Sequence, residues 1–158
     1  MRVEVVRSKK RRKTISALQV GDDLVRVSIP ASLSRAEEEH WVEEMLRRFT
    51  KRALADRVDL DLRARQLAEE HGFPTPRSVR WVDNQTSRWG SCTPADATIR
   101  LSSRMVGFPR WVIDAVLVHE LAHLVEPRHN TRFDALCARY PMSERATGYL
   151  LAKGFDGD

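Results

Sequence analysis

Three histidines and one glutamate lie close together in the segment DAVLVHELAHLVEPRHN, residues 114–130. His119 and His123 are four positions apart, which places both imidazoles on one face of a helix. Glu120 follows His119 directly, in a pattern whose two histidines bind zinc and whose glutamate acts on a water molecule. Most of the other residues are apolar, and burying ionisable groups costs several kcal/mol unless each finds a partner or a metal. The segment therefore predicts a zinc (Zn2+) centre.

A catalytic zinc needs three protein ligands and one open position for water. His129 is the third ligand that we expect, because it follows His123 by six positions and lies just after Pro127, which must end the helix. The metzincin signature has the same ligand spacing, but it has a glycine at the turn where this chain has Glu126. Glu144 is the alternative third ligand, if a later helix returns its carboxylate to the metal.

Two ordinary interpretations of the histidines compete with this one. A histidine in an apolar helix is usually a core residue that has one hydrogen-bond partner. Here, however, three of the five histidines of the chain fall within eleven positions. A structural zinc site usually closes with cysteines, and neither Cys92 nor Cys137 belongs to a CxxC pair. We therefore expect an open, catalytic site.

In such a site Glu120 is the expected general base, which takes a proton from water and passes it to the leaving amine. The oxyanion that develops during the reaction needs a hydrogen-bond donor or a positive charge besides the metal. Arg88, Tyr140 and Tyr149 are the candidates for this role.

The segment TIRLS, residues 98–102, is expected to be a strand next to the zinc helix. An edge strand here would pair with the extended backbone of a peptide, and Ile99, Arg100 and Leu101 would then contact the substrate. The alternative is an internal strand whose Ile99 and Leu101 face the core. The sequence leaves both possibilities open.

The elements before this region predict an α+β fold. Residues 1–30 are expected to form three N-terminal strands with a turn at 21–23, which gives a β-hairpin region. Ser34 and Glu37 form a capping box that opens an amphipathic helix. A second helix is expected from about Asp59 to His71, before a glycine that can end it.

Residues 78–158 are expected to form the core around the zinc site. The segments SVRWVD and ATIRLSS, joined by the loop NQTSRWGSCTPAD, predict a small antiparallel sheet beside the cleft. The apolar segment from Arg110 to about Val125 predicts a central helix that carries the HExxH pattern. Two more helices are expected, one capped by Asn130 or Thr131 and one that ends at Gly154.

Composition limits the class of protein. The chain of 158 residues, 42% hydrophobic and 31% charged, fits a single soluble globular domain over residues 1–158. No apolar run approaches the roughly 20 residues that span a bilayer, so we expect no membrane partner. The N-terminus lacks the apolar segment of a signal peptide, and two cysteines cannot form a disulfide framework. These features predict a cytoplasmic protein.

The N-terminal arm accounts for the net charge of +5. Residues 1–13 carry a net charge of +6, and the rest of the chain carries −1. A nearly neutral body argues against a broad nucleic-acid-binding surface. The basic run Lys9–Lys13 could make a weak contact with nucleic-acid phosphates, although such charges also protect exposed strand edges from aggregation.

Several motifs together resemble one protein family. RWGSC, the strand TIRLSS and FPRWVIDAVLVHELAHLVEPRHNTRF are similar to the YgjP-like metallopeptidases, which are related to SprT-like and Spartan/Wss1-type zinc peptidases. The N-terminal segment RSKKRRKTISALQV resembles the same family, so the resemblance covers nearly the whole chain.

The resemblance implies a zincin-like fold, zinc binding by His119, His123 and His129, and catalysis by Glu120. It implies no particular peptide or protein substrate. We therefore expect a zinc metallopeptidase in which Glu120 is the general base. Two alternatives stay open: a zinc hydrolase that acts on a non-peptide amide, and a nucleic-acid-associated module that only binds zinc.

Overall fold

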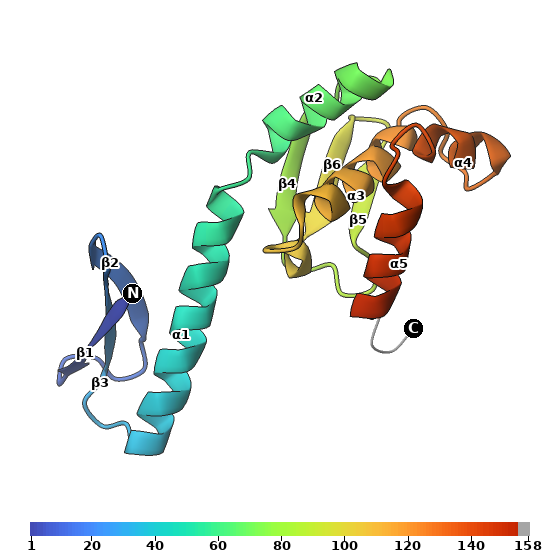
Figure 1. The fold of residues 1–158 in the computed structure, drawn as a ribbon. Coiled ribbons are helices and arrows are strands. Elements are labelled where there is room, and N and C mark those ends of the chain that lie inside the picture. The colour runs from blue at the N-terminus through green and yellow to red at the C-terminus, as the bar shows by residue number, and fades with distance from the viewer. Residues whose placement is uncertain (155–158) are drawn as a thin grey trace. The chain divides into compact units, whose positions relative to one another are not determined.

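A computed structural model describes residues 1–154 (Figure 1). The chain divides into two compact units, Met1–Leu54 and Ala55–Asp158, and each has its own three-stranded sheet and apolar core. The mixture of helices and small sheets confirms the expected α+β class. Within residues 1–154, no helix combines the length and the apolar character needed to cross a membrane. The single domain over residues 1–158 stays a prediction.

The first unit contains the three expected strands, β1 (Arg2–Ser8), β2 (Ser16–Gly21) and β3 (Leu24–Pro30). β2 and β3 form the antiparallel hairpin, whereas β1 pairs with the other side of β3 in parallel. The expected β-hairpin is therefore present, but the three strands are not all antiparallel, because β1 joins β3 in parallel. β3 is the central strand, and its alternating side chains Val25, Val27 and Ile29 are buried on one face of the sheet.

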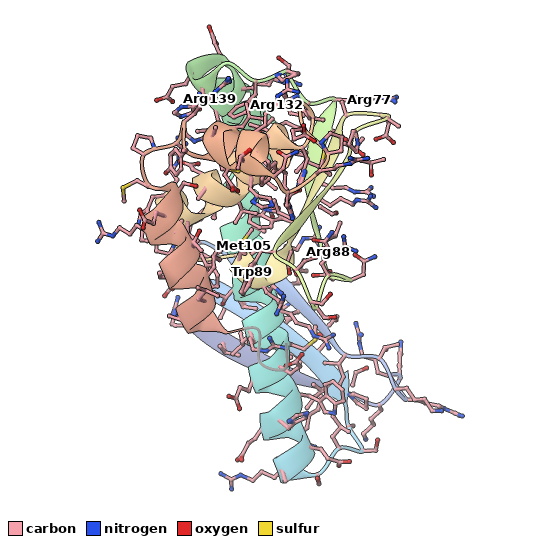
Figure 2. All side chains as sticks on the ribbon, turned by 90° about the vertical axis from the view of Figure 1, so that its right-hand side faces the viewer. Arg77, Arg88, Trp89, Met105, Arg132 and Arg139 are labelled. Carbon is pink, nitrogen blue, oxygen red and sulfur yellow. The ribbon has the colours of Figure 1, made fainter. Side chains whose placement is uncertain are left out.

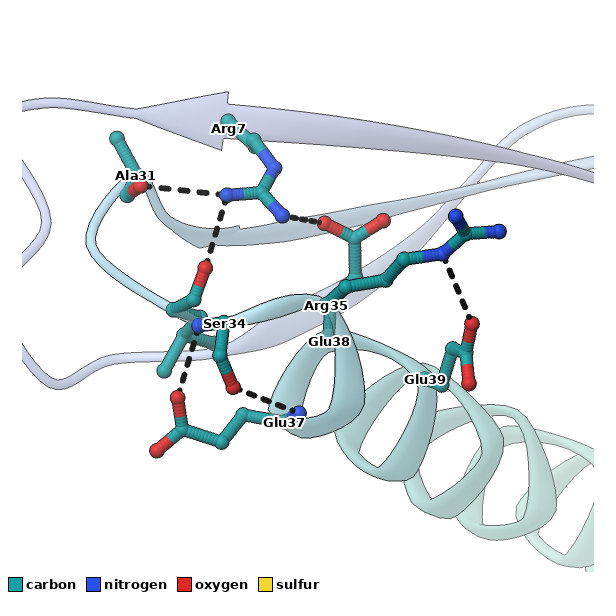
Figure 3. A network of polar contacts seen from close by, with 8 residues as sticks. Arg7, Ala31, Ser34, Arg35, Glu37, Glu38 and Glu39 are labelled. Atoms are coloured by element: carbon teal, nitrogen blue, oxygen red, sulfur yellow. Dashed lines mark hydrogen bonds and ion pairs between the residues drawn. The ribbon is translucent and has the colours of Figure 1, made fainter.

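Helix α1 (Arg35–Asp56) begins with the expected capping box. The Glu37 side chain accepts a hydrogen bond from the Ser34 backbone N–H at 2.8 Å, and the Ser34 hydroxyl accepts one from the Glu37 N–H at 3.2 Å (Figure 3). Arg7 on β1 donates to two backbone carbonyls of the turn before α1 and pairs with Glu38. These contacts fix the start of α1 against the strand.

The apolar face of α1 packs on the buried side of β3. The α1 residues in this contact are Val42, Met45, Leu46 and Phe49. Their spacing of one to four positions places them on one side of the helix, as the amphipathic pattern of the sequence predicts, whereas Ala53, four positions after Phe49, is exposed. The first unit thus has a small core of its own.

The second unit begins with α2 (Leu60–His71), which has the two expected ends. The Asp59 side chain accepts a hydrogen bond from the Leu62 backbone N–H, which caps the first turn. Gly72 ends the helix in the left-handed region at φ +72°, where a side chain would be strained.

The sheet of the second unit differs from the expected one. Its strands are β4 (Ser78–Val82), β5 (Gly90–Thr93) and β6 (Thr98–Ser102), in the order β4–β6–β5. β4 runs parallel to β6 and β5 runs antiparallel to it, so the sheet is mixed rather than antiparallel. The segment that we expected to be only a loop contains β5.

β6 is the central strand, so the expectation that residues 98–102 form a peptide-binding edge strand is wrong. Both sides of β6 are already paired, which leaves no free backbone groups for a substrate. Ile99 and Leu101 are fully buried in the core. Arg100 lies on the opposite face and donates a hydrogen bond to Thr93. These three residues are therefore structural, and the two edge strands of the sheet are β4 and β5.

A short 3-10 turn, Ser103–Met105, leads to α3 (Arg110–Ala122), which lies across one face of the sheet in Figure 1 and contacts β5 and β6. Ten of its thirteen residues are buried, which confirms the expected central helix. Asp114 of α3 pairs with Arg63 of α2 through two hydrogen bonds. α4 (Thr131–Cys137), capped by Asn130, and α5 (Ser143–Lys153) complete the unit.

Candidate metal centre

The three expected histidines come together at the end of α3. One ring nitrogen of each lies within 4.8 Å of those of the other two, and the Nε2 atoms of His123 and His129 are 3.0 Å apart. No other group of three or more His, Cys, Asp or Glu side chains within residues 1–154 has a comparable arrangement. Imidazole nitrogens are ligands that zinc prefers, so the donor set fits this metal.

The backbone after α3 brings His129 back to the other two histidines. The helix ends at Ala122, a few residues earlier than expected, and His123 is its C-cap. The Glu126 side chain accepts a hydrogen bond from the Arg128 N–H at 3.0 Å, within the turn that contains Pro127. No residue of this turn has a positive φ. The chain therefore reverses here without the glycine of the metzincin signature.

A backbone hydrogen bond orients His123. Its Nδ1 lies 3.2 Å from the carbonyl oxygen of Glu126. A carbonyl can only accept, so Nδ1 must carry the proton and donate it. This leaves the lone pair on Nε2, the atom that faces His129. Such an outer hydrogen bond fixes both the tautomer and the direction of a metal-binding imidazole.

Phe133 on α4 forms an apolar support for all three imidazoles. Its ring centroid lies 4.8 Å from that of His119, 4.4 Å from that of His123 and 4.7 Å from that of His129. The Asn130 side chain accepts a hydrogen bond from the Phe133 N–H, which fixes the residue in the first turn of α4. Sequence reasoning missed Phe133, because its contact with the three rings depends on how α4 packs against α3, which no local pattern contains.

Burial favours the unprotonated form of two of the three imidazoles. Together with the neighbouring His123 and His129, it lowers the pKa of His119 to about 4. The pKa of His123 is also lowered, mainly by burial. Metal ligands must be deprotonated before they bind. At pH 7 the rings of His119 and His123 are therefore already in the form that binds a cation.

Glu120 is buried against the backbone of β5. Its side chain is 5% exposed, and a β-carbon on Gly90 would lie 2.7 Å from its Oε1 and 3.0 Å from its Cγ. Only glycine at position 90 leaves room for this approach. Burial raises the pKa of Glu120 to about 8, and the nearby Arg88 partly opposes this rise.

Two cavities flank the histidines. One, of about 310 Å³, has His119 and Glu120 in its wall, together with residues of α3, α5 and β5. The other, of about 620 Å³, is lined by His119, His129 and residues of α4 and the start of α5. The two cavities share His119, Ser143 and Thr147. The histidine cluster therefore lies between two cavities that are both open to the surface.

The structure separates the candidates for stabilising an oxyanion. The Tyr140 hydroxyl donates a hydrogen bond to the Trp111 carbonyl at 3.1 Å, so this hydroxyl stabilises the packing of the core. Tyr149 packs edge-on against Trp111 and lines neither of the two cavities. Arg88 is exposed and lines the smaller cavity. Figure 2 shows it on the outside of the unit, whereas the next residue, Trp89, points into the interior.

The remaining candidates lie beside the centre rather than in it. Glu144 lines the larger cavity, but it does not belong to the group of side chains that could hold one ion. Cys92 and Cys137 are free and half-buried. Burial raises the pKa of each thiol to about 11, which leaves almost no thiolate at neutral pH.

Comparison with known proteins identifies the class. A family model, the YgjP-like metallopeptidase domain, matches residues 4–149. The protein is thus a metallopeptidase, and the chain belongs to the YgjP-like family. This confirms the resemblance seen in the sequence, and membership of the family implies a metal, typically zinc. None of the curated proteins compared with the chain matches it.

Two solved structures share the fold. The crystal structure of the metallopeptidase zymogen abylysin from Pyrococcus abyssi has a TM-score of 0.52 and 19% identity, and the match covers 58% of this chain and 90% of that one. The zymogen of jannalysin from Methanocaldococcus jannaschii has a TM-score of 0.51 and 16% identity, with 61% and 97% covered. Both confirm the zincin-like fold.

The contact between Gly90 and Glu120 predicts the effect of one added methyl group. In Gly90→Ala the new β-carbon must displace the Glu120 carboxyl, because the three atoms nearest to it all belong to that side chain. We expect peptide hydrolysis to fall by at least about tenfold, because catalysis is sensitive to displacements of about 1 Å. Zinc content should stay at the wild-type level. Kinetic assays and metal analysis of the purified variant check both expectations.

Gly148→Ala is the matched control, because no atom lies within 4 Å of a β-carbon at that helical position. It should keep full activity. Wild-type activity in Gly90→Ala would contradict the assigned position of Glu120.

The raised pKa of Glu120 predicts how the stability of the metal-free protein depends on pH. Between pH 4.5 and about 8 the folded state keeps this proton while the unfolded state loses it, so stability falls as pH rises. Glutamine does not ionise, so the stability of Glu120→Gln does not fall for this reason as pH rises. The free energy of unfolding of the variant, relative to wild type, should therefore increase by about 3 kcal/mol between pH 5 and pH 8.

Urea denaturation in the presence of a chelator, at pH 5, 6, 7 and 8, measures this difference. Because both proteins keep His119, its own lowered pKa cancels in the comparison. Parallel stability profiles for the two proteins would show that the Glu120 carboxyl is ionised in the folded state.

Proposed function

We propose that this metallopeptidase hydrolyses peptide bonds with one zinc ion held by His119, His123 and His129, and that Glu120 is its general base. The observation that carries the proposal is the gathering of three imidazole nitrogens within 4.8 Å of one another, next to a buried carboxyl group. Three protein ligands leave a fourth position open for water, as catalytic zinc sites require.

The chain's own residues supply the proton transfers. Bound zinc polarises a carbonyl group and lowers the pKa of water toward 7. Glu120 accepts the proton of the attacking water and then donates it to the nitrogen of the leaving amine. A carboxyl group whose pKa lies near neutrality can do both at physiological pH.

Arg88 is the residue that we propose to stabilise the developing negative charge. It lines the cavity that contains Glu120, and its positive charge already acts on that carboxyl. Within residues 1–154 its guanidinium group makes no hydrogen bond or ion pair. A free cation beside the reacting group costs no rearrangement when charge develops.

The free edge of β5 is the place where we propose that the peptide backbone binds. β5 is one of the two edge strands of its sheet, and it is the one whose first residue, Gly90, lies against Glu120. An extended peptide that pairs with this edge gains backbone hydrogen bonds that do not depend on its sequence. This proposal replaces the role first expected of residues 98–102.

We place this activity in the cytoplasm, in keeping with two free cysteines. The basic run Lys9–Lys13 lies between β1 and β2, and four of its five side chains are exposed. A weak contact of this loop with nucleic-acid phosphates stays a prediction. No described contact favours it over the ordinary role of a charged surface loop.

Three variants, purified beside the wild type, test the proposal. Glu120→Gln should keep its zinc and lose about 10²- to 10⁴-fold in kcat, the usual contribution of a general base. His129→Ala should bind zinc at least about 100-fold more weakly, since even the loss of an outer partner costs 10- to 100-fold. Zinc content, zinc affinity and cleavage of an unfolded protein are measured for each.

Glu144→Gln is the control, because Glu144 lines the adjacent cavity without belonging to the proposed ligand set. It should keep wild-type zinc affinity. Full activity in Glu120→Gln would overturn the mechanism, and weak zinc binding in Glu144→Gln would make that residue a ligand.

A further inference from the structure

The smaller cavity beside the metal centre has a wall that is mostly apolar. It lies between α3, α5 and the start of β5, and its volume is about 310 Å³. Its apolar lining consists of Trp89, Ala115, Val116, Ala146, Leu150 and Leu151. The hollow is therefore suited to an apolar group.

One residue of this wall is unusually exposed for its type. Leu151 is 68% exposed, and Leu62 is the only other large hydrophobic residue in the described part of the second unit that is comparably exposed. An apolar side chain open to water at the mouth of an apolar hollow is unfavourable on its own. It becomes favourable when an apolar partner covers it.

The position of the cavity identifies the partner. His119 and Glu120, the proposed ligand and general base, are part of its wall. A group that fills the cavity therefore lies immediately next to the bond that is broken. The larger cavity, on the other side of His119, is lined by two carboxylates, Asp134 and Glu144, and by no lysine or arginine. A peptide bound at the histidines would thus meet a mostly apolar cavity on one side and an acidic cavity on the other.

We propose that the cavity binds the side chain of one residue that flanks the cleaved peptide bond, and that this side chain is large and apolar. The proposal rests on the peptidase function proposed above and adds its substrate preference. A volume near the lower end of the range for ligand pockets suits a single side chain rather than a folded element.

The preference should exclude charged side chains. The charged groups in the wall are Arg88 at the exposed rim and Glu120 in the buried part. An aspartate that entered the cavity would lose its water next to apolar groups and a carboxyl. A leucine, methionine or phenylalanine side chain has no charge to desolvate, and it buries apolar surface against α3 and α5.

A peptide series measures the preference. The cleavage sites of the zinc-loaded protein are first located by mass spectrometry on a reduced, unfolded protein. The residue on each side of the main site is then varied among Gly, Ala, Leu, Phe and Asp in synthetic peptides. On one side of the bond, kcat/KM should be about 10- to 200-fold higher for Leu or Phe than for Ala, the range that one or a few methylene groups give in an apolar pocket.

Two variants connect this preference to the cavity. Leu151→Gln makes the rim polar at nearly constant size and should reduce kcat/KM for the Leu and Phe peptides about tenfold, with little effect on the Gly peptide. Leu62→Gln is its matched control, since Leu62 is also exposed on a helix but lies outside this cavity. It should leave every peptide unchanged.

Thr147→Phe adds bulk at an exposed position on α5 that borders this cavity and the larger one. It should reverse the order and favour peptides with Gly or Ala at the sensitive position. Because Thr147 is exposed, this variant does not depend on repacking the core. Circular dichroism and zinc content confirm that each variant is folded and loaded.

The outcomes separate the two proposals. If the zinc-loaded protein cleaves no peptide or unfolded protein, the proposed function fails. If it cleaves peptides but shows the same kcat/KM for Ala, Leu, Phe and Asp on both sides of the bond, the peptidase function stands and the cavity proposal is wrong. A preference that Leu151→Gln and Thr147→Phe leave unchanged would also overturn the cavity proposal.

Discussion

The cost of burying ionisable groups governs the architecture of the second unit. α3 is a helix whose side chains are mostly buried, and it nevertheless carries His119 and Glu120. Desolvation forces both toward their neutral forms, since burial lowers the pKa of His119 and raises that of Glu120. A neutral imidazole is the form that binds a metal, and a carboxyl group that titrates near neutrality is the form that can move a proton. The same desolvation thus suits both residues to the zinc chemistry proposed for them.

Neighbouring elements turn this electrostatic condition into a defined geometry. Gly90 allows β5 to approach the Glu120 side chain, and Phe133 supports the three rings from α4. The turn after α3 serves two purposes, because the Glu126 carbonyl orients His123 while the Glu126 side chain helps to return His129. The histidine cluster and Glu120 therefore depend on three segments, β5, α4 and the turn after α3, that all pack against α3. The two cavities lie in the gaps between these segments.

Local signals made much of this predictable. The HExxH spacing and the expectation that the helix must end before Pro127 were enough to find the three histidines, although the helix already ends at Ala122. The capping residues Gly72 and Asn130 also marked real helix ends. The pairing of the strands in the second sheet was harder to predict. β5 is only GSCT, four residues that include a glycine and a serine, both poor signals for a strand. The central place of β6 depends on pairing with β4 and β5 at once, which no local pattern contains. The support by Phe133 and the cavity wall from α5 likewise depend on long-range packing.

Zinc K-edge X-ray absorption of the loaded protein tests the central claim most directly, because it reports the ligands themselves. The account predicts three nitrogen ligands at about 2.0–2.1 Å and one oxygen at a similar distance, with no sulfur. In His129→Ala one imidazole contribution should disappear. A sulfur ligand at about 2.3 Å, or a wild-type spectrum that His129→Ala leaves unchanged, would contradict an open site held by these three histidines.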